Sequence, residues 1–222
     1  MDQRDFIEIA KHKFANSVTE EDSMYKLLDI YDSLTKSENL LFQSINSLLL
    51  LYFPKLSTNL TLNDALRIER IDNVKDKDDY GAELKDKVLI DSFLSLLKEI
   101  DKAKAECLAK IEDICKRIFP NSSSIIEPLI LARMLKTLGG SKEIPKLTLS
   151  KLQSIGNPKS FYKRPSFGII SNSSLIINKK SKIKAMRKLS EYLMITLKID
   201  VFRKKKDDSV ISEFQKAIND IK

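Results

Sequence analysis

The sequence contains few of the residues that build turn-rich, β-rich or disulfide-stabilised proteins. Its 222 residues include no tryptophan, one histidine, two cysteines, five glycines and six prolines. So few glycines and prolines argue against many tight turns, whereas the abundant leucine, isoleucine, lysine and acidic residues favour helices. The hydrophobic content of 42% is sufficient for a core. We therefore expect an all-α protein.

The scarcity of cysteine and histidine argues against several chemistries. Cys107 and Cys115 lie eight residues apart on an expected helix, a rise of about 12 Å that is too long for a disulfide. No histidine lies near them to complete a zinc site, so we expect two free thiols in a reducing compartment. The single histidine, His12, has no nucleophile partner. The sequence therefore predicts a protein that is not an enzyme and needs no metal or cofactor.

The sequence also lacks an evident secretion signal and membrane span. Its first residues, MDQRDFIEIAKHKF, begin acidic and never form a continuous apolar run. The most apolar stretch, residues 40–53, is shorter than a span and is interrupted by polar side chains. We expect a soluble protein with no membrane partner, located in the cytoplasm, or in the nucleus if the source is eukaryotic.

Positive charge is concentrated in the last third of the chain. Residues 1–140 contain 20 Lys and Arg against 24 Asp and Glu, whereas residues 141–222 contain 19 against 7. A basic third on an acidic body favours a nucleic-acid-binding surface carried by helices, although a merely solvated basic face gives the same pattern.

Hydrophobic spacing and capping residues predict the helices. Thr19 with Asp22, and Ser37 near Glu38, are candidate N-terminal caps, and Pro128 predicts a kink or an irregular start. Helices are expected over residues 2–15, 20–36, 38–52, 84–118, from Asn121 or Ser122 to Gly139, 141–146, 148–154, 180–199, and from Asp207 or Ser209 to 221.

Two of these helices carry further predictions. The helix over 84–118 is long and amphipathic, so we expect it to pair with residues 40–72 as an antiparallel coiled-coil hairpin. The helix over 180–199 begins with cations that a helix N-terminus disfavours, so phosphate contact is the simplest benefit. Its expected inward residues are Ile183, Met186, Leu189, Leu193, Ile195 and Leu197.

The stretch IGNPKSFYKRPSFGII, residues 155–170, interrupts the helical pattern because it contains two prolines. Its cations and hydroxyls suit phosphate and 2′-OH groups, and its aromatic rings could stack on bases. For Phe161 and Phe167 we favour the alternative that the rings anchor the loop in the core.

From this point the order of motifs resembles a known family, the Nop domain. This is the RNA-binding domain of archaeal box C/D ribonucleoprotein scaffolds, their nucleolar counterparts and a related spliceosomal pre-mRNA-processing protein. The resemblance covers about residues 38–221 and rests on the segments LLLLYFPKL, FPNSSSIIEPLILARMLKTLGG, IGNPKSFY, FGIISNSSLI and KIKAMRKLSEYLMITLKIDVF.

The chain departs from the family pattern at several positions. Glu127 stands where the pattern has glycine, and Asn157-Pro158 stand where it has Ala-Glu. Phe167 and Ser173 replace two histidines, and Ile183 replaces a glycine of the basic motif. About 37 residues precede the coiled-coil region, so we expect that the family's fibrillarin-docking N-terminal domain is missing.

The resemblance implies non-catalytic binding of a structured, kink-turn-like RNA together with its small ribosomal-protein-like binder, and homodimer or heterodimer formation through the coiled coil. It implies N-terminal helices and a coiled coil over 1–119, and a Nop-like module over 120–222. An adaptor that has lost RNA binding and a DNA-binding helical protein are the alternatives. The predicted RNA-binding residues are Gly156, Asn157, Lys159, Lys163, Arg164, Ser166, Lys180, Lys182, Lys184 and Arg187.

Overall fold

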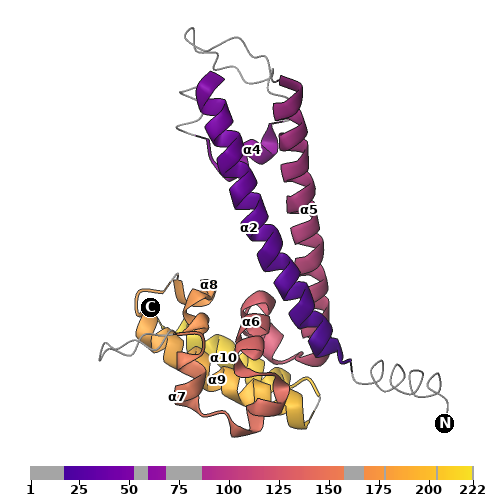
Figure 1. The fold of residues 1–222 in the computed structure, drawn as a ribbon. Coiled ribbons are helices and arrows are strands. Elements are labelled where there is room, and N and C mark those ends of the chain that lie inside the picture. Colours follow the sequence, from indigo (N-terminus) through magenta and orange to yellow (C-terminus); the bar gives the residue numbers. More distant parts are fainter. Residues whose placement is uncertain are drawn as a thin grey trace, which may run out of the picture. The chain divides into compact units, whose positions relative to one another are not determined.

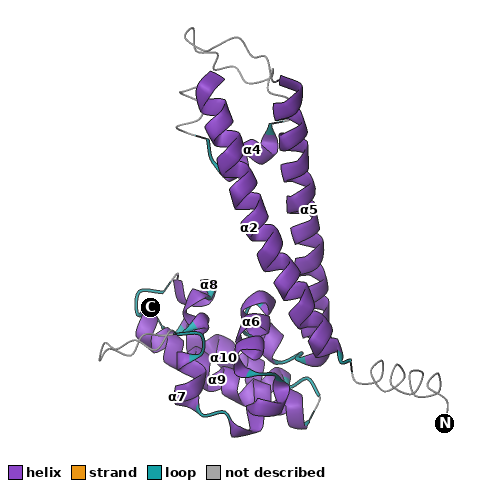
Figure 2. Cartoon of the chain, viewed as in Figure 1, coloured by secondary structure: helices purple, strands orange, loops and turns teal. Residues whose placement is uncertain are grey.

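A computed structural model describes residues 18–52, 60–68, 87–157, 168–177, 179–203 and 205–221. These residues form helices and loops and contain no strand, which confirms the all-α prediction (Figures 1 and 2). The helix expected over residues 2–15 lies outside the described part. In chain order the elements are α2 (Glu20–Tyr52), α4 (Leu62–Arg67), α5 (Lys87–Ile118), η2 (Ser122–Ser124), α6 (Pro128–Leu138), η3 (Ser141–Lys146), α7 (Leu149–Ser154), η4 (Ile169–Asn172), α8 (Ser174–Ile177), α9 (Lys182–Phe202) and α10 (Asp208–Asn219).

The chain divides into two compact units. The arm is Asp29–Cys107, and the module combines Met1–Leu28 with Leu108–Lys222. The sequence predicts a domain boundary between residues 119 and 120, where the Nop-like motifs begin, and this boundary stays a prediction. None of the described helices is apolar over enough residues to cross a membrane.

Helix α2 is one helix where the sequence predicted two. Its start is as predicted, because the Thr19 hydroxyl accepts from the Asp22 N–H at 3.2 Å while the Asp22 carboxylate accepts from the Thr19 N–H at 2.9 Å. The predicted second start at Ser37 is wrong. Neither glycine nor proline interrupts α2, and the Glu38 side chain forms an ion pair with α5 instead of capping a new helix.

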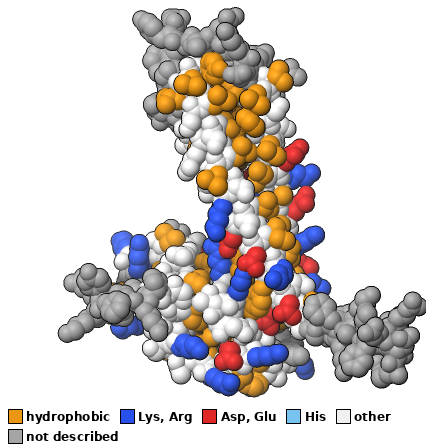
Figure 3. Space-filling model, viewed as in Figure 1, with side chains coloured by type: hydrophobic (Ala, Val, Ile, Leu, Met, Phe, Trp, Pro, Cys, Tyr) orange, Lys and Arg blue, Asp and Glu red, His pale blue; other side chains and the backbone are white. Residues whose placement is uncertain are grey.

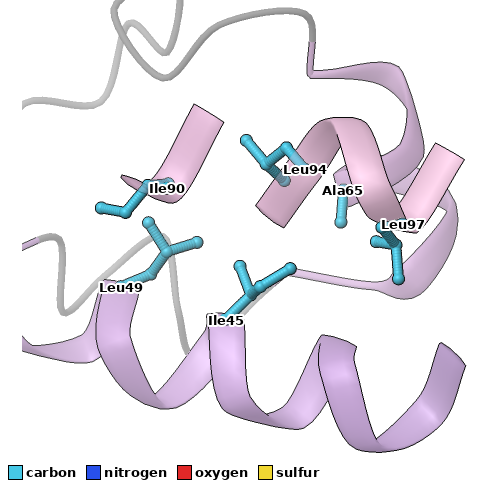
Figure 4. Close-up of a cluster of buried hydrophobic side chains, with 6 residues drawn as sticks. All are labelled: Ile45, Leu49, Ala65, Ile90, Leu94 and Leu97. Carbon is cyan, nitrogen blue, oxygen red and sulfur yellow. The ribbon is translucent and has the colours of Figure 1, made fainter. Parts of the chain in front are cut away.

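In the arm, α2 and α5 pack against each other with α4 (Figure 4). The two helices run antiparallel, because Ile45 and Leu49 share a core with residues 90–97 while Glu38, earlier in α2, binds Lys104, later in α5. This core contains the buried side chains of Ile45, Leu49, Ala65, Ile90, Leu94 and Leu97. The antiparallel packing agrees with the predicted pairing, and the coiled-coil geometry itself stays a prediction.

Helix α4 contributes Ala65 to this core, and its start is fixed by a capping box. The Thr61 hydroxyl accepts from the Asp64 N–H at 3.3 Å, and the Asp64 carboxylate accepts from the Thr61 N–H at 3.3 Å. Two otherwise orphan N–H groups are thereby satisfied at the helix end. The cap therefore helps a helix of only six residues to hold a buried alanine against its longer neighbours.

In the module, helix α6 begins at Pro128, which occupies the first helical position, where a missing N–H costs little. The irregular start expected at this proline is confirmed, since a short 3₁₀ turn, η2, precedes it. The prediction that Asn121 or Ser122 caps the helix is wrong. The side chains of both residues instead donate to the buried carboxylate of Asp200.

Two glycines end α6 as predicted, and the structure adds a reason for the second. Gly139 adopts φ +97° and donates to the Leu135 carbonyl at 3.1 Å, a left-handed helix end that glycine accepts without strain. Gly140 lies against Glu21, whose carboxylate oxygens accept from the Ser141 N–H and the Ser141 hydroxyl, each at 2.6 Å. The pair therefore allows the start of α2 to bind the start of η3.

Helix α9 is the central helix of the module, and α10, α7, α8 and η3 pack against it. Its predicted inward residues Met186, Leu189, Leu193 and Leu197 are buried. The same prediction is wrong for Ile183 and Ile195, which are 55% and 45% exposed. Ile195 lies nine residues after Met186, or two and a half turns at 3.6 residues per turn, which places it on the opposite side of the helix.

The last helix, α10, begins at Asp208 after the predicted cap residue Asp207. The Asp207 carboxylate accepts from the Ser209 N–H at 3.2 Å, which satisfies one orphan donor of the first turn. Phe214 of α10 packs on Tyr192 of α9 with ring centroids 5.6 Å apart. This contact helps to hold the end of the chain against the central helix.

Candidate nucleic-acid interface

The predicted RNA-binding loop leaves and rejoins the module at the end of α7. Two backbone bonds tie its ends together: Gly168 N–H donates to Gln153 at 2.8 Å, and Ile169 N–H donates to Ile155 at 2.8 Å. Asn157 N–H donates back to Ser154 at 3.1 Å. Predicted site residues Gly156 and Asn157 thus belong to the base of this loop. The predicted site residues Lys159, Lys163, Arg164 and Ser166 lie outside the described residues.

The two glycines at the loop base are required by the packing of the protein itself. Gly156 adopts φ +77°, and a Cβ there would lie 2.3 Å from Cγ1 of Ile169. At Gly168 an added Cβ would lie 1.8 Å from the Ile155 carbonyl oxygen. Contacts this short do not occur between real side chains, so both positions need glycine for the fold. The predicted role of Gly156 in admitting RNA is a separate claim, and it stays a prediction.

The remaining predicted site residues gather at the start of α9. Lys180, Lys182, Lys184 and Arg187 are all exposed, and within the described part of the chain no carboxylate lies within ion-pair distance of them. Their neighbour Lys188 differs, because it binds Glu191 at 2.9 Å. We call these four unpaired cations the α9 cationic face. Figure 3 shows one side of the module, on which lysine and arginine are spread over the surface.

The helix end itself adds to the positive potential of this face. Ser181 occupies the cap position but makes no side-chain capping bond. The first N–H groups of α9 are therefore not satisfied by a side-chain cap, and the helix dipole places partial positive charge there. Cations at such a position raise the free energy of the isolated helix and attract anions.

Sequence reasoning missed a polar cluster at the start of α8. Glu127, the residue before α6, accepts from the Ser173 hydroxyl at 2.8 Å and from the Ser174 N–H at 2.7 Å. Burial raises the pKa of Glu127, but the hydrogen bonds from Ser174 and Ser173 together outweigh it and hold the pKa below its usual value. The only signal in the sequence was that Glu127 and Ser173 both depart from the family pattern, and 46 residues separate them.

A cavity of about 480 Å³ in the module is lined by apolar residues and by three polar ones whose side chains are already bonded. Arg117 binds Glu20 at 3.2 Å and Asp113 at 3.5 Å, and Asp200 accepts from Asn121 and Ser122. The lining residues are Arg117, Ile118, Phe119, Pro120, Ser141, Asp200 and Val201. Because its one cation, Arg117, is already paired and its other charged group is the carboxylate of Asp200, this cavity is a weaker candidate for an anionic ligand than the α9 cationic face.

The two cysteines are free thiols within the described residues. Burial raises the pKa of Cys115 to about 12, so the thiolate needed for nucleophilic or metal chemistry is scarce at neutral pH. In the same part of the chain, no group of three His, Cys, Asp or Glu side chains is placed to hold a metal ion. The α9 cationic face instead offers positive charge and the N–H donors of an uncapped helix start, which suit the binding of an anion.

An exposed cationic helix start on an all-α module is typical of the nucleic-acid-binding class of proteins. The model of the Nop family, described as "snoRNA binding domain, fibrillarin", matches residues 55–221. The chain belongs to the Nop family, an RNA-binding and scaffold family rather than a catalytic one. This confirms the resemblance predicted from the motifs.

The solved structures include a chain of similar fold in the crystal structure of a fibrillarin/Nop5p complex. That chain is 19% identical, aligns with a TM-score of 0.63, and the alignment covers 100% of this chain and 81% of that one. At 19% identity this structural similarity shows that the two chains share a fold, and it shows no more than that. A search of curated proteins finds no match.

Proposed function

We propose that this chain binds a structured RNA within a box C/D-type ribonucleoprotein and does so without catalysis. The observation that carries the proposal is the α9 cationic face, four exposed and unpaired cations at an uncapped helix start in a chain of the Nop family. Phosphates are the anions that such a face would bind in an RNA-binding protein.

The second part of the proposal is a composite ligand, a kink-turn-like RNA with its small ribosomal-protein-like binder. Two large exposed apolar side chains lie close in sequence to the cations of the α9 cationic face: Ile177 is 56% exposed and Ile183 is 55% exposed. Isoleucine gains nothing from a phosphate, whereas it can pack against a protein surface or an unstacked base. A surface that mixes cations with exposed isoleucines therefore supports a ligand made of RNA and protein.

The test is a matched pair of charge-reversed variants. Lys182→Glu/Lys184→Glu/Arg187→Glu should lower the affinity for a kink-turn RNA carrying its bound protein. It should also make the salt dependence of log K shallower by about one for each lost phosphate contact. The control reverses the same number of exposed cations on other helices, at Lys36 of α2 and at Lys102 and Lys110 of α5. Equal binding by the α9 variant and wild type would refute the proposal.

Two other functions are outcomes of the same measurements. An adaptor that has lost RNA binding would show binding to the protein component alone, with little dependence on salt. A DNA-binding protein would show comparable affinity for duplex DNA in a competition assay. A pull-down followed by sequencing of the bound RNA would identify the RNA class.

We propose as a second function that the arm associates with another copy of the chain or a related one. The arm exposes several large apolar side chains, and Figure 3 shows hydrophobic atoms running along it. The exposed apolar side chains of the arm include Leu40, Leu50, Leu51, Val88, Leu89 and Leu96, and Val88 is 80% exposed. Leu40→Glu/Val88→Glu should convert a dimer to a monomer in sedimentation equilibrium, and a wild-type chain that is monomeric alone would favour a heterologous partner.

A further inference from the structure

Glu127 bridges the start of α6 and the corner that precedes α8. One carboxylate oxygen accepts from the Ser173 hydroxyl at 2.8 Å. The other accepts from the Ser174 N–H at 2.7 Å and from the Ser174 hydroxyl at 2.5 Å. We call this set of three residues the Glu127 latch. Charge-assisted bonds of this kind are stronger than neutral ones, so three together define the position of the corner.

A continuous series of bonds runs from the latch to the α9 cationic face. The Ser173 carbonyl accepts from the Ile176 N–H at 3.0 Å, and the Ile176 carbonyl accepts from the Lys179 N–H at 3.1 Å. Lys180, the first cation of the face, is the next residue. Helix α8 has only four residues, too few to be stable alone. Its geometry therefore depends on the latch before it and on its packing against α9.

The latch also consumes the donors that the corner would otherwise offer to a phosphate. Both serine hydroxyls and the Ser174 N–H point to the Glu127 carboxylate, which itself repels anions. The two residues at which the chain departs from the family pattern here, Glu127 and Ser173, are thus in direct contact with each other. The two departures act as a single structural change at this corner.

We propose that Glu127 is a positioning residue for the RNA interface: it fixes α8 and thereby places Lys180, which lies just before α9. The effect on RNA rests on the proposed function above, whereas the fixing of α8 does not. The inference therefore has one consequence in the free protein and one in the complex.

The experiment compares Glu127→Ala, the milder Glu127→Gln, and a matched control, Glu213→Gln. Glu213 is exposed on α10, and its side chain makes no hydrogen bond or ion pair within the described residues. Backbone ¹⁵N order parameters in the free protein should be about 0.85 for Ser174, Ile176 and Lys179 in wild type. They should fall toward about 0.6 in Glu127→Ala while α9 stays rigid. The order parameters of Glu127→Gln should lie between those of wild type and Glu127→Ala, and those of Glu213→Gln should match wild type.

The RNA measurement uses the same proteins with a kink-turn RNA and its small binder. Glu127→Ala should weaken binding several-fold and make the salt slope shallower by about one, because Lys180 is no longer placed on a phosphate. A merely less stable protein would lose binding through its unfolded fraction and keep the wild-type slope.

The outcomes separate the two ideas. Unchanged order parameters in both Glu127 variants would overturn the latch, whatever the RNA does. Changed order parameters with an unchanged salt slope would overturn the positioning role. A wild-type chain that binds no RNA would refute the proposed function together with the RNA consequence, and the order parameters would still decide whether Glu127 fixes α8.

Discussion

The most sharply defined prediction concerns Asp200, a carboxylate that is 2% exposed in the module. It accepts four hydrogen bonds: from the N–H groups of Asn121 and Ser122 at 3.0 and 2.9 Å, and from their side chains, each at 2.7 Å. Asn121 in turn accepts from the Asp207 N–H at 2.6 Å and donates to the Lys205 carbonyl at 2.8 Å. Asp200, in the last turn of α9, thus binds the segment that follows α5 and, through Asn121, is connected to the start of α10.

The cost of removing this carboxylate follows from the groups left behind. In Asp200→Ala the two side-chain donors retain partial alternatives, since Ser122 Oγ lies 3.3 Å from Thr196 Oγ1 and Asn121 keeps its bond to Lys205. The two buried N–H groups keep none among the described residues, and each costs about 1–3 kcal/mol when unsatisfied. We therefore expect Asp200→Ala to lower the free energy of unfolding by about 4 kcal/mol. This is a large part of the about 5–15 kcal/mol by which a typical folded protein is stable.

Urea unfolding followed by circular dichroism measures this loss directly. Asp200→Ala should lower the midpoint at an unchanged m-value, and Asp200→Asn, which keeps one acceptor oxygen, should lose about half as much. The control Asp220→Asn removes an exposed charge whose side chain makes no hydrogen bond or ion pair within the described residues, and it should stay within about 0.5 kcal/mol of wild type. A loss below about 1 kcal/mol for Asp200→Ala would refute the argument.

Three further predictions follow from other contacts. Gly168→Ala should lower the free energy of unfolding by about 2 kcal/mol, because its Cβ would lie 1.8 Å from the Ile155 carbonyl; a neutral effect in urea unfolding would contradict the packing. Lys104→Ala leaves the Glu38 carboxylate, at 1% exposure, buried without its ion pair, so it should lower the free energy of unfolding by about 3 kcal/mol. Lys104→Leu/Glu38→Leu should lower it by less, because no charge is then left buried. A double variant less stable than Lys104→Ala would argue against this reasoning. The pKa of Glu127 is below its usual 4.5 in the folded state, so ionised Glu127 contributes to stability above pH 4.5, and this contribution is lost as pH falls through the folded pKa. The difference in unfolding free energy between wild type and Glu127→Gln should therefore shrink in acid. A difference that widens in acid would contradict this prediction.

Helix ends marked by strong local signals were predictable from the sequence. Gly139 ends α6, and Thr19 and Asp207 cap their helices as expected. Local backbone chemistry decides these positions, and the sequence displays it. The predicted cap at Ser37 failed because a capping residue is also tolerated inside a helix when packing continues on both sides of it. Tertiary contacts along α2 outweigh that weak local preference.

The interface was predictable only in its charges. The exposed positions of Lys180, Lys182, Lys184 and Arg187 follow from their place in the basic run, because unpaired cations are rarely buried. The contacts of Glu127 could not be predicted, since its serine partners lie 46 and 47 residues away and no periodicity connects them. Such pairs require either the folded structure or a set of related sequences in which the two positions change together.

The start of α9 combines features that oppose helix stability. Its N-terminus carries cations instead of acids, and Ser181 provides no side-chain cap. Burial on the opposite face compensates, because Ala185, Met186 and Leu189 are each at most 2% exposed in the first turns. The hydrophobic core therefore holds in place an electropositive helix end that would be unfavourable in an isolated peptide. Binding an anion there would remove the charge repulsion while leaving the core unchanged, so a phosphate at this end both finds its partners already arranged and stabilises the helix that presents them.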